Sequence, residues 1–131
     1  MPPECPPTIV GSWETEVDTH VDPTFGALLS FTVSRTMTVV DNRPRNGETI
    51  TTGFGTWKRT GLRTFEFLFK RFHLNGDGEA LYTFQVHEKI VLSKDSRSYA
   101  GEGVAELVFP DGTVFDIPGV YNTAGKRIAV P

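Results

Sequence analysis

The sequence predicts an all-β protein, a single antiparallel up-and-down β-barrel of seven or eight strands. Thr, Val and ten Phe residues are prominent whereas Ala and Leu are sparse, and β-branched and aromatic residues favour strands. Turn signals recur at the spacing of antiparallel strands. A Gly11-Ser12-Trp13 motif near the start is matched by Gly125-Lys126-Arg127 near the end, and a closed barrel requires its first and last strands to meet.

Size and charge narrow the class of protein further. The 131 residues correspond to about one ordinary domain. The formal net charge of −3 argues against nucleic acid as a partner, because phosphate contacts need a basic face. Cys5 is the only cysteine in the chain, which excludes an intramolecular disulfide and a cysteine metal cluster.

The N-terminal residues lack the pattern of a targeting segment. Residues 1–7 are rich in Pro and are predicted to form a short extended tail, followed by one barrel domain over 8–131. The tail has neither the basic stretch nor the apolar stretch of a signal peptide. No run in the chain approaches the roughly 20 apolar residues of a membrane span. We therefore expect a cytoplasmic protein without a membrane span.

Turn signals set the limits of each predicted strand. Asp22-Pro23 ends the first run, the polar stretch 41–47 ends the second, and Asp111-Gly112 is the two-residue kind that favours a type I′ hairpin. Pro118-Gly119 is either a bend or a true turn, which leaves the number of strands at seven or eight. The predicted strands cover approximately residues 8–20, 27–40, 49–60, 62–74, 79–92, 97–109, 113–118 and 119–130.

With Gly11-Ser12-Trp13 in the first strand and Arg127 in the last, the chain resembles the lipocalin-like, or calycin, families of small up-and-down barrels. An Arg stacked on a Trp adds roughly 0.5–2 kcal/mol and would close the barrel at Trp13 and Arg127. The chain departs from secreted lipocalins in having no disulfide pair, no clear C-terminal helix and a shorter length. It also looks like the allene-oxide-cyclase-like barrels, a group that includes bacterial cyclases of natural-product intermediates. No catalytic residue carries over from that group.

Alternation of side chains fixes which residues of the first strand face inward. If Trp13 points into the barrel, Thr15 and Val17 do so too. The opposite face then carries an outer row that is more typical of a solvated surface than of a metal site: Glu14, Glu16, Asp18 and His20. The three histidines share no metal-ligand spacing, so neither a metal nor a cofactor is expected.

Two charges interrupt otherwise apolar strand faces and are the candidate catalytic residues. Arg35 falls on the apolar face of the 27–40 run, and Glu88 falls among the apolar residues of the 79–92 run. Burying either charge alone would cost several kcal/mol, so we expect both to project into the barrel and pair, directly or through water. Arg35 would hold a ligand oxygen, and Glu88, its pKa raised by desolvation, would transfer a proton. The alternatives are a purely structural ion pair and a strand end at which both side chains reach solvent.

The 62–74 run carries Phe65, Phe67 and Phe69 at period two, and Phe72 breaks this parity unless a bulge lies near Lys70-Arg71. His73 is expected at a barrel rim. Four basic residues flank one hairpin, as a solvated edge or as a means of steering an anionic ligand: Lys58, Arg59, Arg63 and Arg71.

Small residues in the 97–109 run either accommodate large neighbours or leave room for a ligand: Gly101, Gly103 and Ala105. Aromatic side chains with polar handles suit such a pocket. The predicted ligand-binding residues are Trp57, Tyr82, Phe84, Tyr99, Tyr121, Phe31, Phe67 and Met37.

Internal charges favour an enzyme over a simple carrier, because an apolar cargo does not require them. The sequence thus predicts cofactor-independent isomerisation or cyclisation of an apolar, oxygen-bearing small molecule, by conformational restriction and electrostatic stabilisation. One alternative is a non-catalytic, lipocalin-like carrier of a hydrophobic ligand. Another is a filled barrel that acts through its surface, as a homodimer built on an exposed strand.

Overall fold

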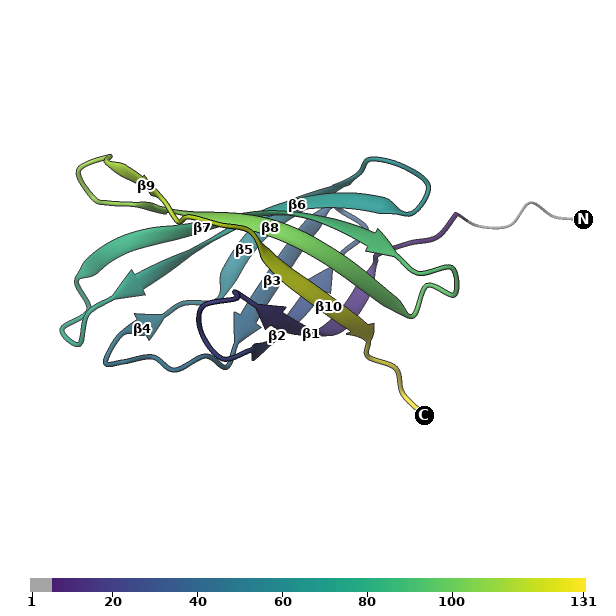
Figure 1. Ribbon diagram of the computed structural model, residues 1–131, viewed down its shortest axis with the longest axis horizontal. Coiled ribbons are helices and arrows are strands. Elements are labelled where there is room, and N and C mark those ends of the chain that lie inside the picture. Colours follow the sequence, from purple (N-terminus) through teal and green to yellow (C-terminus); the bar gives the residue numbers. More distant parts are fainter. Residues whose placement is uncertain (1–5) are drawn as a thin grey trace, which may run out of the picture.

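The computed structural model describes residues 6–131, which form a closed antiparallel sheet (Figure 1). Cys5 and most of the predicted Pro-rich tail lie outside the described residues. No helix occurs within 6–131, and hence none there could cross a membrane. The strands are β1 (Gly11–Asp18), β2 (Phe25–Phe31), β3 (Thr36–Asp41), β4 (Thr49–Ile50), β5 (Gly53–Arg59), β6 (Thr64–Leu74), β7 (Ala80–Leu92), β8 (Ser98–Val108), β9 (Val114–Asp116) and β10 (Tyr121–Arg127).

Eight of these strands close the barrel in the order in which they occur along the chain. The ring runs β1-β2-β3-β5-β6-β7-β8-β10, and β10 pairs with β8 on one side and with β1 on the other. The short strands β4 and β9 lie outside the ring, on β6 and β8 respectively. The prediction of an all-β, up-and-down antiparallel barrel is confirmed.

The predicted single strand over 27–40 is wrong, because the chain reverses at residues 32–35 between β2 and β3. The Arg35 amide donates a hydrogen bond to the Thr32 carbonyl at 3.1 Å. Arg35 itself has a left-handed backbone conformation, with φ of 67°. Hydroxyl side chains stabilise this turn locally, and the Oγ1 atoms of Thr32 and Thr36 form a hydrogen bond at 2.7 Å. The turn therefore forms without Gly or Pro.

Strand β6 alternates without interruption through the position where a bulge was predicted. Phe72 points outward and is 57% exposed, whereas Arg71 and His73 are buried. The register between β6 and β7 shifts only at His73/Leu74. The predicted bulge near Lys70-Arg71 is therefore wrong, and the consequence is that two polar side chains enter the barrel.

One end of the barrel is sealed where β1 begins and β10 ends, toward the right of Figure 1. Trp13 is fully buried, and its partner in the β1–β10 register is Arg127. The Arg127 guanidinium carbon lies 4.3 Å from the Trp13 ring centroid. The same guanidinium donates hydrogen bonds to the carbonyls of Val10 and Thr8, each at 2.7 Å, and of Ser96 at 2.9 Å. This cap holds the first strand, the last strand and a turn together.

Replacing Arg127 with Ala removes this cap. We expect a loss of about 2 kcal/mol or more in the free energy of unfolding, because three carbonyls lose a charged donor and the Trp13 ring loses its cover. Urea denaturation measures the loss. Arg97→Ala is the matched control, since the Arg97 side chain is exposed, and should change stability by no more than about 0.5 kcal/mol. Equal effects of the two substitutions would contradict a role for the cap.

Candidate functional site

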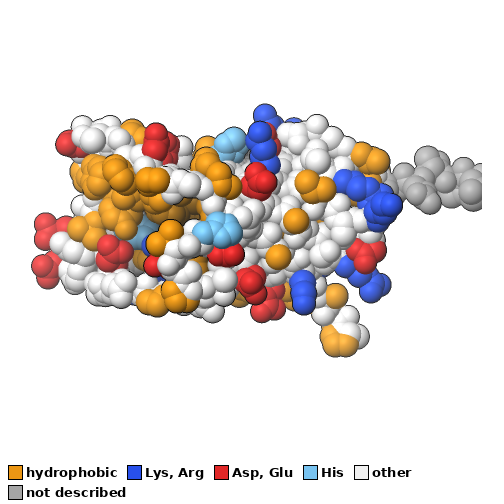
Figure 2. Space-filling model, viewed as in Figure 1, with side chains coloured by type: hydrophobic (Ala, Val, Ile, Leu, Met, Phe, Trp, Pro, Cys, Tyr) orange, Lys and Arg blue, Asp and Glu red, His pale blue; other side chains and the backbone are white. Residues whose placement is uncertain are grey.

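A cavity of about 350 Å³ occupies the other end of the barrel. Hydrophobic side chains gather around this hollow at the left of Figure 2. Its mouth includes the β1–β2 loop and the segment 117–120, and its wall is mainly apolar. Apolar wall residues include Phe25, Leu29, Phe69, Phe84 and Val86. Such a cavity suits a small molecule with an apolar body.

Glu88 lies at the polar inner part of this cavity, on the inward face of β7, and is only 2% exposed. Desolvation raises its pKa to about 8, although the nearby Thr123 and Tyr121 hydroxyls oppose the shift. Among residues 6–131, neither Glu88 Oε1 nor Thr123 Oγ1 has a hydrogen-bond partner. Unpartnered buried polar atoms are rare in folded proteins. The carboxyl is therefore protonated at neutral pH and has hydrogen-bonding capacity left for a ligand.

Glycines on the neighbouring strands make room for the side chains around Glu88. A Cβ on Gly103 would overlap the Tyr121 ring, and a Cβ on Gly125 would overlap the Tyr99 ring. A Cβ on Gly101 would lie 3.3 Å from Glu88 Cδ. The small-residue face thus accommodates large neighbours. Burial raises the pKa of both tyrosines well above the usual range.

Arg71 forms a second polar group in the cavity, whereas the sequence interpretation placed it among the basic residues that flank a hairpin. Its side chain is 4% exposed, and Nη1 pairs with the Asp41 carboxylate. Nε donates to His73 Nε2 at 3.2 Å, and His73 Nδ1 lies 3.1 Å from Glu48 Oε2. Because Nε2 accepts, the proton of the neutral imidazole is assigned to Nδ1. Burial lowers the pKa of His73 and of Arg71, while Asp41 opposes the shift at Arg71.

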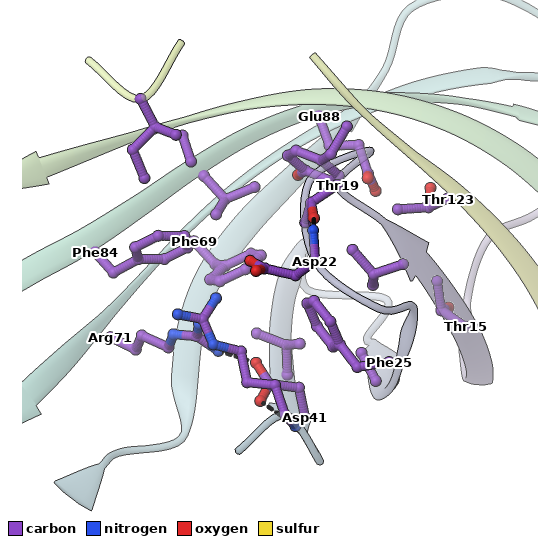
Figure 3. A pocket seen from close by; sticks show the side chains of 18 of the residues that line it. Thr15, Thr19, Asp22, Phe25, Asp41, Phe69, Arg71, Phe84, Glu88 and Thr123 are labelled. Carbon is purple, nitrogen blue, oxygen red and sulfur yellow. Dashed lines mark hydrogen bonds and ion pairs between the residues drawn. The ribbon is translucent and has the colours of Figure 1, made fainter. Parts of the chain in front are cut away.

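Glu88 and Arg71 lie at opposite ends of the same cavity (Figure 3). In the β6–β7 register Arg71 faces Phe84, which precedes Glu88 by four residues on β7. Four residues of strand correspond to about 13 Å. The apolar side chains of Phe69, Phe84 and Val86 line the cavity between the two polar groups.

The expectation that Arg35 projects into the barrel and pairs with Glu88 is wrong. Arg35 is exposed in the turn that follows β2, at the sealed end. Extrapolating strand alternation through an unrecognised turn placed it on the wrong face. The buried guanidinium of the cavity is that of Arg71, whose position follows from continuing the Phe65, Phe67, Phe69 alternation by one step.

The predicted ligand-binding residues divide into three groups. Four line the cavity: Tyr82, Phe84, Phe67 and Tyr121. Three are buried in the core but do not line it: Tyr99, Phe31 and Met37. Trp57 is half-buried near the sealed end, where Nε1 donates to the Thr32 carbonyl at 3.0 Å and the ring packs against Phe65.

The remaining histidines lie away from the cavity. His20 contacts Asp18 and Asn122 on the outside of the barrel, and His87 is exposed near Glu66. Within the described part of the chain, no group of three or more His, Cys, Asp or Glu side chains is placed to hold a metal.

Comparison with known proteins gives no match for this chain among protein-family models, curated proteins or solved structures. Its function is therefore inferred from the cavity and from the side chains that line it.

The raised pKa of Glu88 makes stability depend on pH. Between the ordinary glutamate value of 4.5 and about 8, unfolded Glu88 is ionised while folded Glu88 stays protonated. As the pH rises through this window, the free energy of unfolding should fall by about 1.4 kcal/mol per pH unit relative to Glu88→Gln, which cannot titrate. Below the window the difference between the two proteins is constant.

Urea denaturation of both proteins across this pH range tests the prediction. Glu102→Gln, which removes an exposed carboxylate on β8, is the control and should show no such slope relative to the wild type. Parallel profiles for the wild type and Glu88→Gln would show that Glu88 is ionised in the folded protein.

Proposed function

We propose that this protein binds an apolar, oxygen-bearing small molecule in its barrel and isomerises or cyclises it without a cofactor. The observation that carries the proposal is the Glu88 carboxyl, buried at the polar part of an apolar cavity with Oε1 unpartnered. A carboxyl with a pKa of about 8 is mostly protonated at neutral pH. Because this pKa is close to neutral pH, the carboxyl can both donate and accept a proton there. Burial of this carboxyl costs free energy of folding, so its position is better explained by proton transfer than by a contribution to stability.

The proposed mechanism uses Glu88 as both acid and base. The protonated carboxyl donates a hydrogen bond and then a proton to a ligand atom, and the carboxylate regains a proton from another ligand atom within the same turnover. The product thus has the composition of the substrate, and Glu88 is regenerated. The apolar wall holds the ligand in one conformer, which lowers the entropic barrier to ring closure or migration.

Two neighbouring hydroxyls support the charge that develops on Glu88. Tyr121 and Thr123 both line the cavity beside it, and their proximity favours the ionised carboxyl. Tyr121 remains protonated throughout, because its pKa is raised by burial and by Glu88. Arg35 has no part in this mechanism.

The architecture is compatible with the resemblance to lipocalin-like and allene-oxide-cyclase-like barrels. The closed ring of eight strands and the Trp13–Arg127 contact support a likeness in architecture. We propose that the likeness extends to binding a small molecule inside the barrel. A non-catalytic carrier is the second candidate, because the cavity wall is mainly apolar and its mouth is open at one end.

Liquid chromatography with mass spectrometry distinguishes the two candidates. A metabolite extract of the source organism is incubated with the wild type, with Glu88→Gln, with Glu102→Gln and without protein. We expect one compound to be converted to an isomer of equal mass by the wild type and by Glu102→Gln. Glu88→Gln should be slower by about 100-fold or more, as is typical for loss of a general acid or base.

A parallel incubation in deuterium oxide tests the proton-transfer step. An isomer that gains one deuterium only with active protein supports exchange through Glu88. A compound retained by the wild type without conversion would identify a carrier. Equal conversion by the wild type and Glu88→Gln would refute the catalytic role of Glu88.

A further inference from the structure

We propose that the ligand carries a second oxygen function, a carboxylate, at the end nearer the cavity mouth, and that Arg71 binds it. This inference rests on the proposed function, which places the ligand in this cavity. It concerns a different part of the molecule from Glu88, and it defines the substrate class as an apolar acid with an oxygen at its far end.

The Arg71 guanidinium is fixed in one position with one edge unused. Nη1 is held by Asp41, Nε by His73, and the guanidinium carbon lies 4.7 Å from the Phe84 ring centroid. Among the described residues, Nη2 has no hydrogen-bond partner, and Arg71 lines the cavity. A guanidinium held in this way loses little conformational entropy when it binds a carboxylate.

Guanidiniums and carboxylates both lie around Arg71. Arg71 and Arg45 share the single carboxylate of Asp41. Arg43 also lines the cavity and forms no ion pair within the described residues. Its guanidinium carbon lies 5.8 Å from the Phe25 ring centroid and 5.7 Å from the Phe84 ring centroid. Glu48, which contacts His73, supplies one further negative charge. Three guanidiniums thus lie near Asp41 and Glu48, and a third carboxylate, Asp22, lines the cavity.

Asp22 is the remaining charged group on the cavity lining. It lies on the β1–β2 loop, and it is exposed. Water and salt screen an exposed carboxylate more strongly than they screen the buried Arg71. Among the described residues, neither Asp41 nor Asp22 accepts a hydrogen bond from Nη2, which is therefore the donor left for an anion.

Spacing in the cavity defines the shape of the ligand. The β6–β7 register separates the backbone positions of Arg71 and Glu88 by four residues, or about 13 Å along the strands. The cavity wall between these two positions is apolar. The ligand is accordingly a hydroxy or keto acid with an apolar body, held with its carboxylate at Arg71 and its second oxygen at Glu88.

Three rigid, fluorescent probes test this assignment. The first is a hydroxynaphthoate with hydroxyl and carboxylate at opposite ends of the two rings, the second is its methyl ester, and the third is naphthol. Binding is measured by fluorescence titration with the wild type, with Arg71→Gln and with Arg45→Gln. Arg45 is the matched control, because it pairs with the same Asp41 but does not line the cavity.

We expect the wild type to bind the acid roughly 10- to 100-fold more tightly than the ester, as for hydrogen bonds to a charged group. Arg71→Gln should abolish this ratio while leaving ester and naphthol affinities within about 3-fold, and Arg45→Gln should retain it. If Arg71→Gln fails to fold, the double variant Arg71→Gln/Asp41→Asn, which removes both charges of the pair, takes its place.

The outcomes separate this inference from the proposed function. Equal affinity for acid and ester, or a ratio that survives in the Arg71 variant, would overturn the inference while leaving the proposed function intact. Absence of binding by all three probes would count against both. Loss of the ratio in Arg45→Gln as well would assign it to general surface charge rather than to Arg71.

Discussion

Pairing of the first strand with the last is the constraint on which the rest of this structure depends. Once β10 joins β1, every strand of the ring has two neighbours and one face that must turn inward. Arg127 fixes this junction by stacking on Trp13 and capping three carbonyls, two in the segment before β1 and one in the turn before β8. Because that end is sealed, the free interior volume lies at the opposite end. The location of the cavity is therefore a consequence of how the barrel closes.

Within this closed interior, two ionisable groups are accommodated in different ways. Arg71 retains its charge, because Asp41 and His73 surround it with suitable partners. Among the described residues Glu88 has no cationic partner, and it instead keeps its proton. Neither arrangement is the most stable choice for a small barrel core, where apolar residues of similar volume would avoid the desolvation penalty. We propose that recognition of a ligand with two polar ends accounts for their presence in one cavity.

The sequence was most informative where alternation continues without a turn. Glu88 was placed correctly on the inner face because the alternation of buried and exposed residues in β7 runs unbroken from Val86 to Leu92. Arg35 was misplaced because a turn made of Ser and Thr carries no Gly or Pro signal. The inward position of Arg71 was not predicted, because the apolar Phe72 was expected to face inward and so suggested a bulge, whereas it is exposed. Alternation predicts the facing side of a residue, whereas the stagger of the strands decides its depth in the barrel. Tyr99 and Met37 accordingly face inward without reaching the cavity.

The most direct test of this account is the titration of Glu88 itself. Nuclear magnetic resonance of the carbon-13 side-chain carboxyl, assigned by its loss in Glu88→Gln, would follow protonation as the pH is raised. The account predicts a midpoint near pH 8, well above the ordinary glutamate value of 4.5, and a change in this midpoint when naphthol occupies the cavity. A midpoint at the ordinary value, unaffected by naphthol, would show that Glu88 is ionised and solvated and would contradict the central claim.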